Sequence, residues 1–390
     1  MPKRPQPEQI HLAYGGAPSK MSVTLADVRR HGNFVRDVGP SERALTQKVR
    51  ASVSRFVDGG TNHSVRYIHR AMITGIVPGR RHYYRVGSHR GRAAAFIFAV
   101  YGDLGDINAR SLGKLQEMTQ AGAFDMVIHN GDLAYNLDID QGQRGDDFMR
   151  QIQPVAAHLP YMVSVGNHEQ AYNFSHFKNR FTMPSSTSIW APLTSSPSPS
   201  EFYFFTNYGR AQIQNQWAWL INDLKVQSER KPEASAVGSS STLIVRCTAR
   251  TSQNASAVRR TSFFATVSGT SGRYGLEKVL YNYGVDLYIG AHQHNYEVFY
   301  PIYNFHGKTA PFTDPPLPVH VTTGSAGCQE KTYAFPKTPS RISAFRSSNY
   351  GFTKMQVFNS THIRIQQLLA TGTKVENQFW LIKHSHPHRL

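Results

Sequence analysis

Four short apolar runs along this chain each end in a glycine-containing turn that carries polar side chains. The runs cover residues 96–100, 126–128, 161–165 and 285–289, and each is typical of a short buried strand. The turns that follow them read YGDLG, NGDLAYN, GNHE and GAHQHNYE. Since open α/β sheets place their ligands at the carboxyl ends of strands, we expect these four turns to meet at one site.

Between these runs, apolar residues recur at helical spacing, and core packing explains them without any functional role. The alternation of strand and helix patterns predicts a layered α/β domain in which helices cover sheets. The residues at helical spacing fall in three groups: Leu112, Leu115 and Met118; Phe148, Ile152 and Val155; Ile213, Trp217, Leu220, Ile221 and Leu224.

The chain before residue 98 has a different pattern, with short β-like runs separated by glycine and proline turns. Residues 67–73 and 82–86 are examples, and Pro78-Gly79 marks the turn before the second. This pattern favours a small β-sandwich of immunoglobulin or fibronectin kind. We therefore predict two domains, 1–98 and 99–390, and expect the first, which carries no ligand cluster, to have a structural or docking role.

Composition narrows the functional classes. The formal net charge of +18 is compatible with nucleic-acid binding, but no basic helix, zinc finger or aromatic-basic RNA motif accompanies it, so no nucleic-acid partner is expected. No apolar run approaches the length of a membrane span, and the N-terminus shows no apolar core of a signal peptide. Two cysteines, Cys247 and Cys328, give no disulfide framework, and the last eight residues are expected to be a frayed end despite their histidines.

The polar residues of the four turns supply mixed oxygen and nitrogen donors. Such a set suits two adjacent metal ions, because one carboxylate can bridge while the remaining ligands divide between the ions. The six candidate ligands are Asp103, Asp132, Tyr135, Asn167, His292 and His294.

At these residues the sequence resembles the purple acid phosphatases of the metallophosphoesterase superfamily, and above all their animal, secreted, two-domain forms. The resemblance covers nearly the whole chain and includes NRFTMP, EFYFFTNYG, TGSAGC and SAFRSSNYG as well as GDLG, GDLAY, GNHE and HQH. Tyr135 is the discriminating residue, because other metallophosphoesterases generally lack a tyrosine ligand there.

The resemblance implies an acid phosphatase that hydrolyses small phosphomonoesters with a metal-bound hydroxide as nucleophile. Fe(III) would be bound by Asp103, Asp132, Tyr135 and His294. Asp132 would bridge to a divalent ion (zinc, manganese or ferrous iron) that Asn167 and His292 also bind. His168 would be catalytic, beside the substrate phosphate. A secreted or lysosomal location follows from the resemblance, with weak support from sequons at Asn62, Asn173 and Asn359, and a homodimer is compatible with it.

One ligand of the family is missing. A further histidine, within Gly-His-Arg-Pro-Met-Tyr-Cys-Ser-Asn in animal forms, should lie between Leu224 and Tyr274, but residues 225–273 hold no histidine. A disordered insertion, rich in Ser, Thr, Ala and Arg, would explain the segment. A shifted reading frame is a more specific explanation. Residues 243–251 can be obtained by translating, one base later, DNA that encodes Ala-His-Arg-Pro-Met-Tyr-Cys-Ser-Asn. Residues 25–38 convert by a one-base shift, and residues 189–198 by a shift in the other direction, to family-like segments.

Our hypothesis is therefore that out-of-frame segments interrupt an otherwise intact phosphatase sequence. The chain as it stands would then be impaired, because the second metal loses a ligand and a core strand with its loop is replaced. Three alternatives stay open at this stage: a catalytically inactive secreted relative with a binding or structural role, a metallophosphoesterase acting on nucleotides or phosphodiesters, and a nucleic-acid binder.

Overall fold

The N-terminal part of the chain is an antiparallel sheet. The computed structural model describes residues 8–17, 19–27, 35–40, 44, 46–77, 82–84, 87–88, 96–181, 196–197, 211–229, 243–246, 275–303, 306–307, 309–359 and 361–384. Seven strands follow the order β1-β2-β5-β4-β3-β6-β7. Their bounds are β1 (Glu8–Tyr14), β2 (Lys20–Asp27), β3 (Val35–Gly39), β4 (Gln47–Val57), β5 (Val65–Thr74), β6 (Tyr83–Tyr84) and β7 (Gly87–Ser88).

Strand β4 belongs to two ladders, pairing with β3 through residues 47–50 and with β5 through residues 51–57. Apolar side chains from both ladders pack into one core, in which Val23 of β2 and Val38 of β3 are both buried. The structure thus confirms the predicted N-terminal β domain, with two ladders enclosing one core as in a β-sandwich. The exact boundary between the predicted domains stays a prediction.

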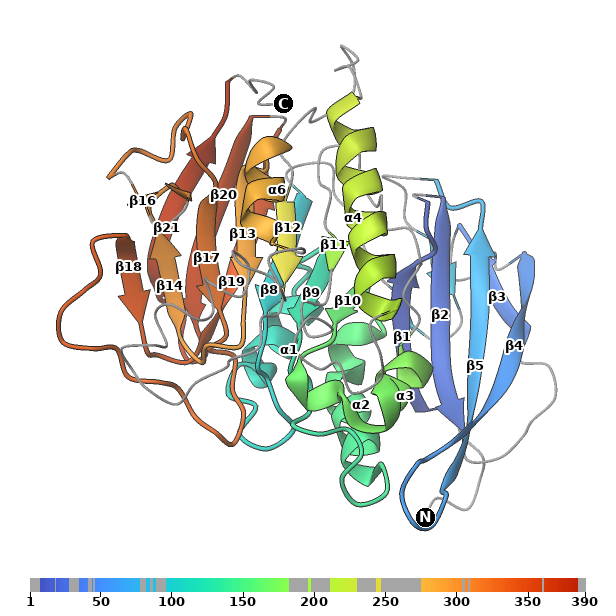
Figure 1. The fold of residues 1–390 in the computed structure, drawn as a ribbon. Coiled ribbons are helices and arrows are strands. Elements are labelled where there is room, and N and C mark those ends of the chain that lie inside the picture. The colour runs from blue at the N-terminus through green and yellow to red at the C-terminus, as the bar shows by residue number, and fades with distance from the viewer. Residues whose placement is uncertain are drawn as a thin grey trace.

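Two six-stranded sheets form the centre of the second domain (Figure 1). The first has the order β10-β9-β8-β19-β20-β21, with parallel pairing from β8 to β10 and antiparallel pairing elsewhere. Its strands are β8 (Phe96–Tyr101), β9 (Met126–Asn130), β10 (Tyr161–Ser164), β19 (Gly351–Val357), β20 (His362–Leu369) and β21 (Val375–Ile382).

The second sheet has the order β11-β12-β13-β17-β14-β18, parallel from β11 to β17 and antiparallel at β14 and β18. Its strands are β11 (Ser196–Pro197), β12 (Leu243–Arg246), β13 (Leu287–Gly290), β14 (Tyr296–Phe299), β17 (Val319–Thr323) and β18 (Ser343–Ser347). A separate hairpin joins β15 (Ile302–Tyr303) to β16 (His306–Gly307).

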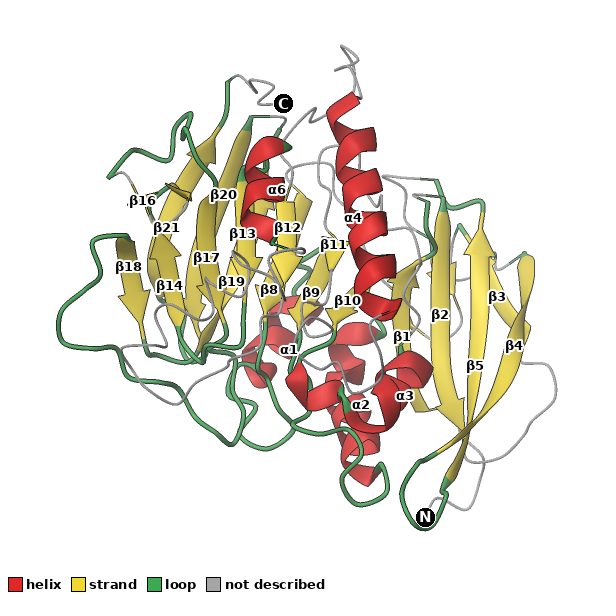
Figure 2. Ribbon diagram, in the orientation of Figure 1, coloured by secondary structure: helices red, strands yellow, loops and turns green. Residues whose placement is uncertain are grey.

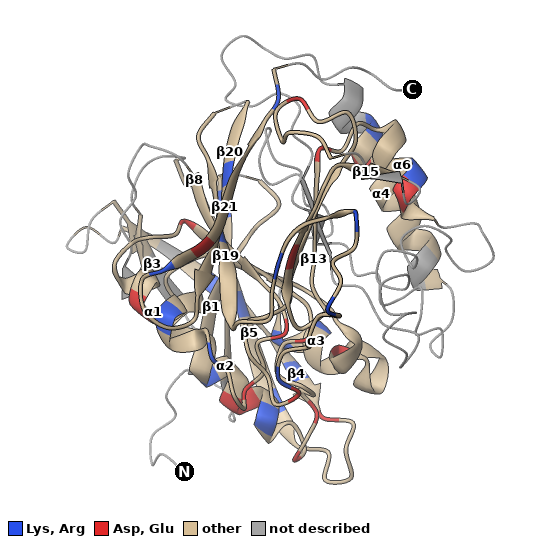
Figure 3. Ribbon diagram, turned by 90° about the vertical axis from the view of Figure 1, so that its left-hand side faces the viewer, with Lys and Arg blue, Asp and Glu red and all other residues tan. Residues whose placement is uncertain are grey.

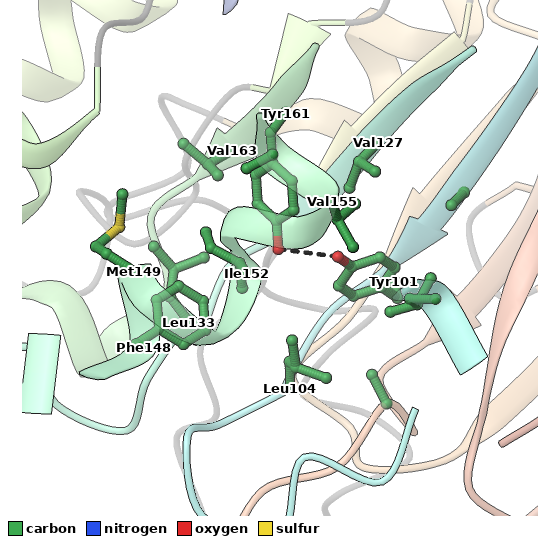
Figure 4. Packing of buried hydrophobic residues seen from close by; sticks show 14 of the residues in the cluster. Tyr101, Leu104, Val127, Leu133, Phe148, Met149, Ile152, Val155, Tyr161 and Val163 are labelled. Atoms are coloured by element: carbon green, nitrogen blue, oxygen red, sulfur yellow. Dashed lines mark hydrogen bonds between the residues drawn. The ribbon is translucent and has the colours of Figure 1, made fainter. Parts of the chain in front are cut away.

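Helices cover the outer faces of the two sheets (Figure 2). Apolar residues of both sheets, such as Ile128 and Val321, form the core between them. On the outer face of the first sheet, Phe148 and Ile152 of α2 pack around Tyr101 and Tyr161, whose hydroxyls lie 2.8 Å apart (Figure 4). The helices are α1 (Leu112–Gln120), α2 (Gln143–Ala156), α3 (Ala171–Arg180), α4 (Ala211–Glu229), α6 (Leu276–Asn282) and the 3₁₀ turn η1 (Asn167–Glu169).

The layered α/β architecture and the three predicted helices are confirmed. Of the residues at helical spacing in α4, Leu220 and Leu224 are buried against α6, whereas the side chain of Ile213 lies outside the described residues. None of the helices in the described ranges is long and apolar enough to cross a membrane.

The three stretches assigned to a shifted frame are described only in part. Residues 28–34, 189–195, 198 and 247–251 lie outside the described ranges, as do residues 385–390 of the tail. Within the stretch that replaces the histidine segment, Leu243–Arg246 form β12, paired in parallel with β13. A strand is therefore present at this place in the sheet, and the branched residues Ile244 and Val245 favour strand formation.

Basic and acidic residues are interspersed along the described part of the chain (Figure 3). In Figure 3, blue and red segments lie interspersed along the chain, among them around α1 and α2. Some of these charges are paired, as Arg144 is with Asp106 at 2.9 Å. The expected lack of a nucleic-acid partner stays a prediction.

Candidate active site

The four polar turns lie at the carboxyl ends of β8, β9, β10 and β13, as the sequence predicts. They come from two sheets, however: β8, β9 and β10 are neighbours in the first sheet, whereas β13 lies in the second. The first turn is held directly to the second and to β17, through Asp103 N donating to Gly131 O (3.2 Å) and Gly102 N donating to Thr323 O (2.9 Å).

Non-glycine residues in the left-handed backbone region gather in these turns. Asp103 (φ 58°), Asp132 (φ 49°), Tyr135 (φ 52°) and His292 (φ 73°) all adopt it. Such conformations cost about 1–3 kcal/mol each and persist where the surrounding structure enforces them, often at functional sites. Four of the six predicted ligands therefore sit on strained backbone.

Asp103, Tyr135 and His294 form one hydrogen-bonded group, which we call the first group. Tyr135 Oη donates to Asp103 Oδ1 (3.1 Å) and lies 2.7 Å from His294 Nε2, and His294 Nδ1 lies 2.8 Å from the carbonyl oxygen of Lys331. The His294 ring stacks on Tyr333 with centroids 4.4 Å apart. All three members of the group are buried, so their orientation is fixed by packing as well as by hydrogen bonds.

Protonation in the first group follows from this geometry. Burial opposes a charge on His294, but its interactions with Asp103 and Cys328 outweigh burial and raise the pKa of His294 to about 12. Burial and the nearby carboxylates raise the pKa of Tyr135 well above its usual value, and burial raises that of Asp103 despite His294. The proton on His294 thus balances carboxylate charge while Tyr135 stays a neutral phenol, and a bound cation can supply that balance instead.

Asp132, Asn167 and His292 form the second group. His292 Nδ1 lies 3.5 Å from Asp132 Oδ2, and the backbone N–H of His292 donates to Asp103 Oδ2 (2.8 Å), which joins the two groups. Although burial opposes its ionisation, the neighbouring His292 and the charge of His168 hold the pKa of Asp132 below its usual value. Asn167 Oδ1 and His292 Nδ1 are buried and have no hydrogen-bond partner among the described residues.

Two glycines allow the polar groups to approach so closely. A Cβ atom on Gly166 would lie 2.2 Å from Asp132 Oδ1, and one on Gly324 would lie 2.6 Å from Asp103 Oδ2. Side chains at these positions would push the two carboxylates out of place.

His168 lies beside both groups. Its backbone N–H donates to Asp132 Oδ1 (3.0 Å), and its ring packs on Tyr135 with centroids 4.2 Å apart. Its Nδ1 lies 2.6 Å from Asn136 Oδ1, which leaves Nε2 facing Glu330 at 3.7 Å.

Sequence reasoning gave no role to Glu169, which the structure places beneath the second group. Its carboxylate accepts hydrogen bonds from the backbone N–H groups of Gly166 (2.7 Å), Leu133 (2.8 Å) and Asp132 (3.1 Å). Burial, reinforced by the charge of Asp132, raises the pKa of Glu169 to about 8 in spite of these donors. Its position in GNHE is visible in the sequence, but two of the three donors to its carboxylate, Asp132 and Leu133, come from a different turn.

The polar side chains of the two groups meet some, but not all, of the requirements of a site for two metal ions. Each group brings one carboxylate, one imidazole and a further donor, a phenol in the first and an amide in the second, and the second has two buried atoms without a partner. Within the described ranges, no three His, Cys, Asp or Glu side chains form a group that could hold a metal ion. Each group includes only two residues of these four types.

Comparison with known proteins agrees with this arrangement. Residues 96–296 match the family model for calcineurin-like phosphoesterases, residues 7–99 that for the purple acid phosphatase N-terminal domain, and residues 317–377 that for iron/zinc purple acid phosphatase-like protein C. The fold and the polar site thus define a metallophosphoesterase.

Similarity to individual proteins narrows the assignment from the metallophosphoesterases in general to one family among them. The chain is 38% identical to the human (Homo sapiens) protein named acid phosphatase type 7, over 97% of this chain and 91% of that protein, and 34% identical to the zebrafish (Danio rerio) protein of the same name, over 98% and 92%. A purple acid phosphatase from yellow lupin (Lupinus luteus) seeds has a similar fold, with a TM-score of 0.74 at 18% identity over 97% of this chain and 75% of that one. The chain belongs to the purple acid phosphatase family, a family of phosphoric monoester hydrolases with a dinuclear metal centre.

Proposed function

We propose that this chain binds two metal ions, Fe(III) and a divalent ion such as zinc, manganese or ferrous iron, and hydrolyses small phosphomonoesters. The observation that carries the proposal is the pair of adjacent polar groups, which are joined by the bond between His292 N and Asp103. Asp103, Tyr135 and His294 would hold Fe(III), Asn167 and His292 the divalent ion, and Asp132 both. When bound, the metal pair would acidify water and neutralise phosphate charge.

His168 would contact the substrate directly. Since its Nδ1 is directed at Asn136, its Nε2 is the atom that can hydrogen-bond to a phosphate or leaving-group oxygen. The side chain of His168 is 23% exposed, more than that of Asp132 or His294, so a substrate can reach it without displacing the buried ligands.

Metal analysis combined with spectroscopy tests the centre. The purified chain is expected to bind iron and to absorb visible light through the Tyr135 phenolate, and Tyr135→Phe is expected to lose that absorption while the protein stays folded. Hydrolysis of p-nitrophenyl phosphate, measured beside bis(p-nitrophenyl) phosphate, distinguishes a monoesterase from a diesterase. Unchanged absorption in Tyr135→Phe, or a preference for the diester, would overturn the assignment.

We further propose that the chain as written is impaired, because residues 225–273 contain no histidine to complete the second group. Loss of an outer partner of a metal ligand typically lowers affinity or activity by about 10–100-fold, and loss of a ligand should cost at least as much.

Sequencing the transcript across codons 231–272, and comparing the activity of the chain with that of its frame-corrected form, tests this second proposal. We expect the corrected chain to bind the divalent ion more tightly and to be at least ~10-fold more active. The same missing ligand favours a second candidate function, that of an inactive relative which binds a partner instead. A corrected frame without any gain in activity would favour that candidate, whereas full turnover of the uncorrected chain would exclude impairment.

A secreted or lysosomal location is also proposed. The asparagines of the three sequons named above, Asn62, Asn173 and Asn359, are exposed, so a glycan could be attached to each without unfolding the chain. Expression in a secretory cell line, followed by glycosidase treatment and mass measurement, checks whether these sites are used.

A further inference from the structure

Three charged side chains of the N-terminal sheet contact the segments that follow the active-site turns. Figure 1 shows this sheet beside α2 and α3. Asp58 Oδ1 lies 2.5 Å from His176 Nε2 of α3, and Arg70 Nη2 donates to the carbonyl oxygen of Asn179 (2.6 Å), at the end of α3. Arg66 of β5 reaches the first turn of α2.

The Arg66 guanidinium binds the catalytic domain at two places. Its Nε and Nη2 form a fork on Asp146, at 2.8 Å from Oδ1 and 2.6 Å from Oδ2, and Nη2 also donates to the carbonyl oxygen of Gln141 (3.2 Å). Arg180 binds the same carboxylate (2.7 Å) and donates to the carbonyl oxygen of Gly142 (2.9 Å). The side chain of Arg66 is 7% exposed and that of Arg180 is fully buried, so this network is shielded from solvent.

The backbone that these arginines hold is strained. The loop of residues 136–142 begins directly after Tyr135, and four of its residues have positive φ: Asn136 (115°), Asp140 (51°), Gln141 (57°) and Gly142 (82°). A short run of left-handed residues is stable only where other parts of the structure enforce it. The carbonyls of the last two residues are those that Arg66 and Arg180 bind, so the N-terminal domain supports one end of the loop whose other end carries Tyr135 and Asn136.

The second active-site turn is supported in a similar way. His168 and Glu169 of η1 run directly into α3, whose first residues Tyr172, Asn173 and Phe174 also have positive φ. His176 accepts a hydrogen bond from Arg180 on Nδ1 (3.4 Å) and therefore donates from Nε2 to Asp58. The neutral ring implied by this pattern agrees with burial, which lowers the pKa of His176 to about 4.

We propose that the N-terminal domain is part of the active-site support, and that Arg66 is a positioning residue that acts through Gln141 and Asp146 on the loop carrying Tyr135 and Asn136. The sequence-based expectation of a purely structural or docking role for this domain is thereby extended. Only the expected effect of Arg66 on kcat rests on the proposed function. Its effect on how well the loop is ordered can be measured without any turnover.

Hydrogen exchange on the whole chain tests the proposal, with Arg66→Gln as the main variant. The amides of Gly142, Gln143 and Arg144 bond within the loop and report on its order. We expect their exchange to be ~10-fold faster or more in Arg66→Gln, since a hydrogen bond to a charged group contributes on the order of that factor. Tyr84→Phe is the matched control, because it removes a bond from the same domain boundary to the carbonyl of Ala157, at the far end of α2.

Kinetics supply the second readout. The measurement uses whichever form of the chain, original or frame-corrected, is active. Arg66→Gln should lower its kcat for p-nitrophenyl phosphate by about 10-fold, because removing an outer partner of a metal ligand typically costs about 10–100-fold. KM should change little. Arg66→Lys keeps the charge but cannot form the two-pronged bond to Asp146, so its kcat and loop exchange should lie between those of the original chain and Arg66→Gln. It also serves as the test variant if Arg66→Gln does not fold.

Two results would overturn the proposal: loop exchange in the Arg66 variants equal to that in Tyr84→Phe, or a lower melting temperature with exchange unaffected. If no form of the chain hydrolyses phosphomonoesters but the loop exchange responds as expected, the proposed function fails while the positioning role stands.

Discussion

The two groups of the active site differ in how completely the protein satisfies them. In the first group, Tyr135 is hydrogen-bonded to Asp103 and His294, and Tyr333 packs on the imidazole. In the second group, Asn167 Oδ1 and His292 Nδ1 are buried without a described hydrogen-bond partner. A buried polar atom that lacks a partner costs about 1–3 kcal/mol. The protein's own side chains therefore satisfy the first group more completely than the second.

The largest expected effect comes from breaking the first group. Asp103→Asn removes the negative charge and replaces one oxygen with an NH₂ group, so either Tyr135 or the His292 backbone N–H loses its acceptor. We expect iron content to fall and activity to drop by at least ~100-fold if Asp103 is the ligand we propose, because the loss of a metal ligand exceeds that of an outer partner. Metal analysis and p-nitrophenyl phosphate turnover measure this. Asp106→Asn is the control, since Asp106 pairs with Arg144 outside the two groups; equal losses in both variants would contradict the assignment.

Substitutions at the two glycines beside the carboxylates distinguish the first group from the second. Gly324→Ala would crowd Asp103, and Gly166→Ala would crowd Asp132. We expect both to lower activity by about 10–100-fold. Under the proposed assignment, Gly324→Ala should weaken the visible absorption of the Tyr135 phenolate more than Gly166→Ala does, because Asp103 belongs to the Fe(III) set alone whereas Asp132 is shared. A larger loss of absorption in Gly166→Ala would reverse our division of the ligands. Gly113→Ala is the control, because a Cβ atom there meets nothing within 4 Å.

Removing the support beneath the second group should have a smaller effect. Glu169→Gln keeps the volume of the side chain but replaces one acceptor oxygen with an NH₂ group, so at least one of the three backbone N–H donors loses its partner. The expected loss of stability is about 1–3 kcal/mol, measured by denaturant unfolding. Glu117→Gln is the control, because Glu117 is exposed on α1 and pairs only with Lys114 among the interactions described. A loss no greater than that of the control would remove Glu169 from the support.

The smallest expected effect lies outside both groups and concerns pH. Burial lowers the pKa of His11 from 6.5 to about 4. Between these values the unfolded chain binds a proton that the folded chain does not, so stability falls as pH decreases, by up to ~1.4 kcal/mol per pH unit. His11→Asn should flatten this dependence, because its amide can replace the bond from Nδ1 to Gln9 O without titrating. The comparison uses unfolding free energies at pH 5 and pH 7.5, and an unaltered slope would show that His11 does not contribute.

Much of the architecture was accessible from periodicity. The pattern of Phe148, Ile152 and Val155 predicts the buried face of α2, and the four apolar runs predict β8, β9, β10 and β13. These elements are predictable because burial of one face imposes a period that the sequence records. Glu169 was not identified as a support, because two of the three backbone N–H groups that it accepts from belong to another turn.

The sequence by itself determined the elements and the types of donor at their ends, since strand length, turn glycines and ligand chemistry are local properties. Only the tertiary structure decided that the donors of β13 reach those of β8 and β9 across two sheets, and that Asn167 and His292 carry the buried atoms without described partners. It also decided that Arg66 of the N-terminal domain holds the loop after Tyr135. These relations depend on distances between segments far apart in the chain, which packing of the complete fold sets and which no short stretch of sequence encodes.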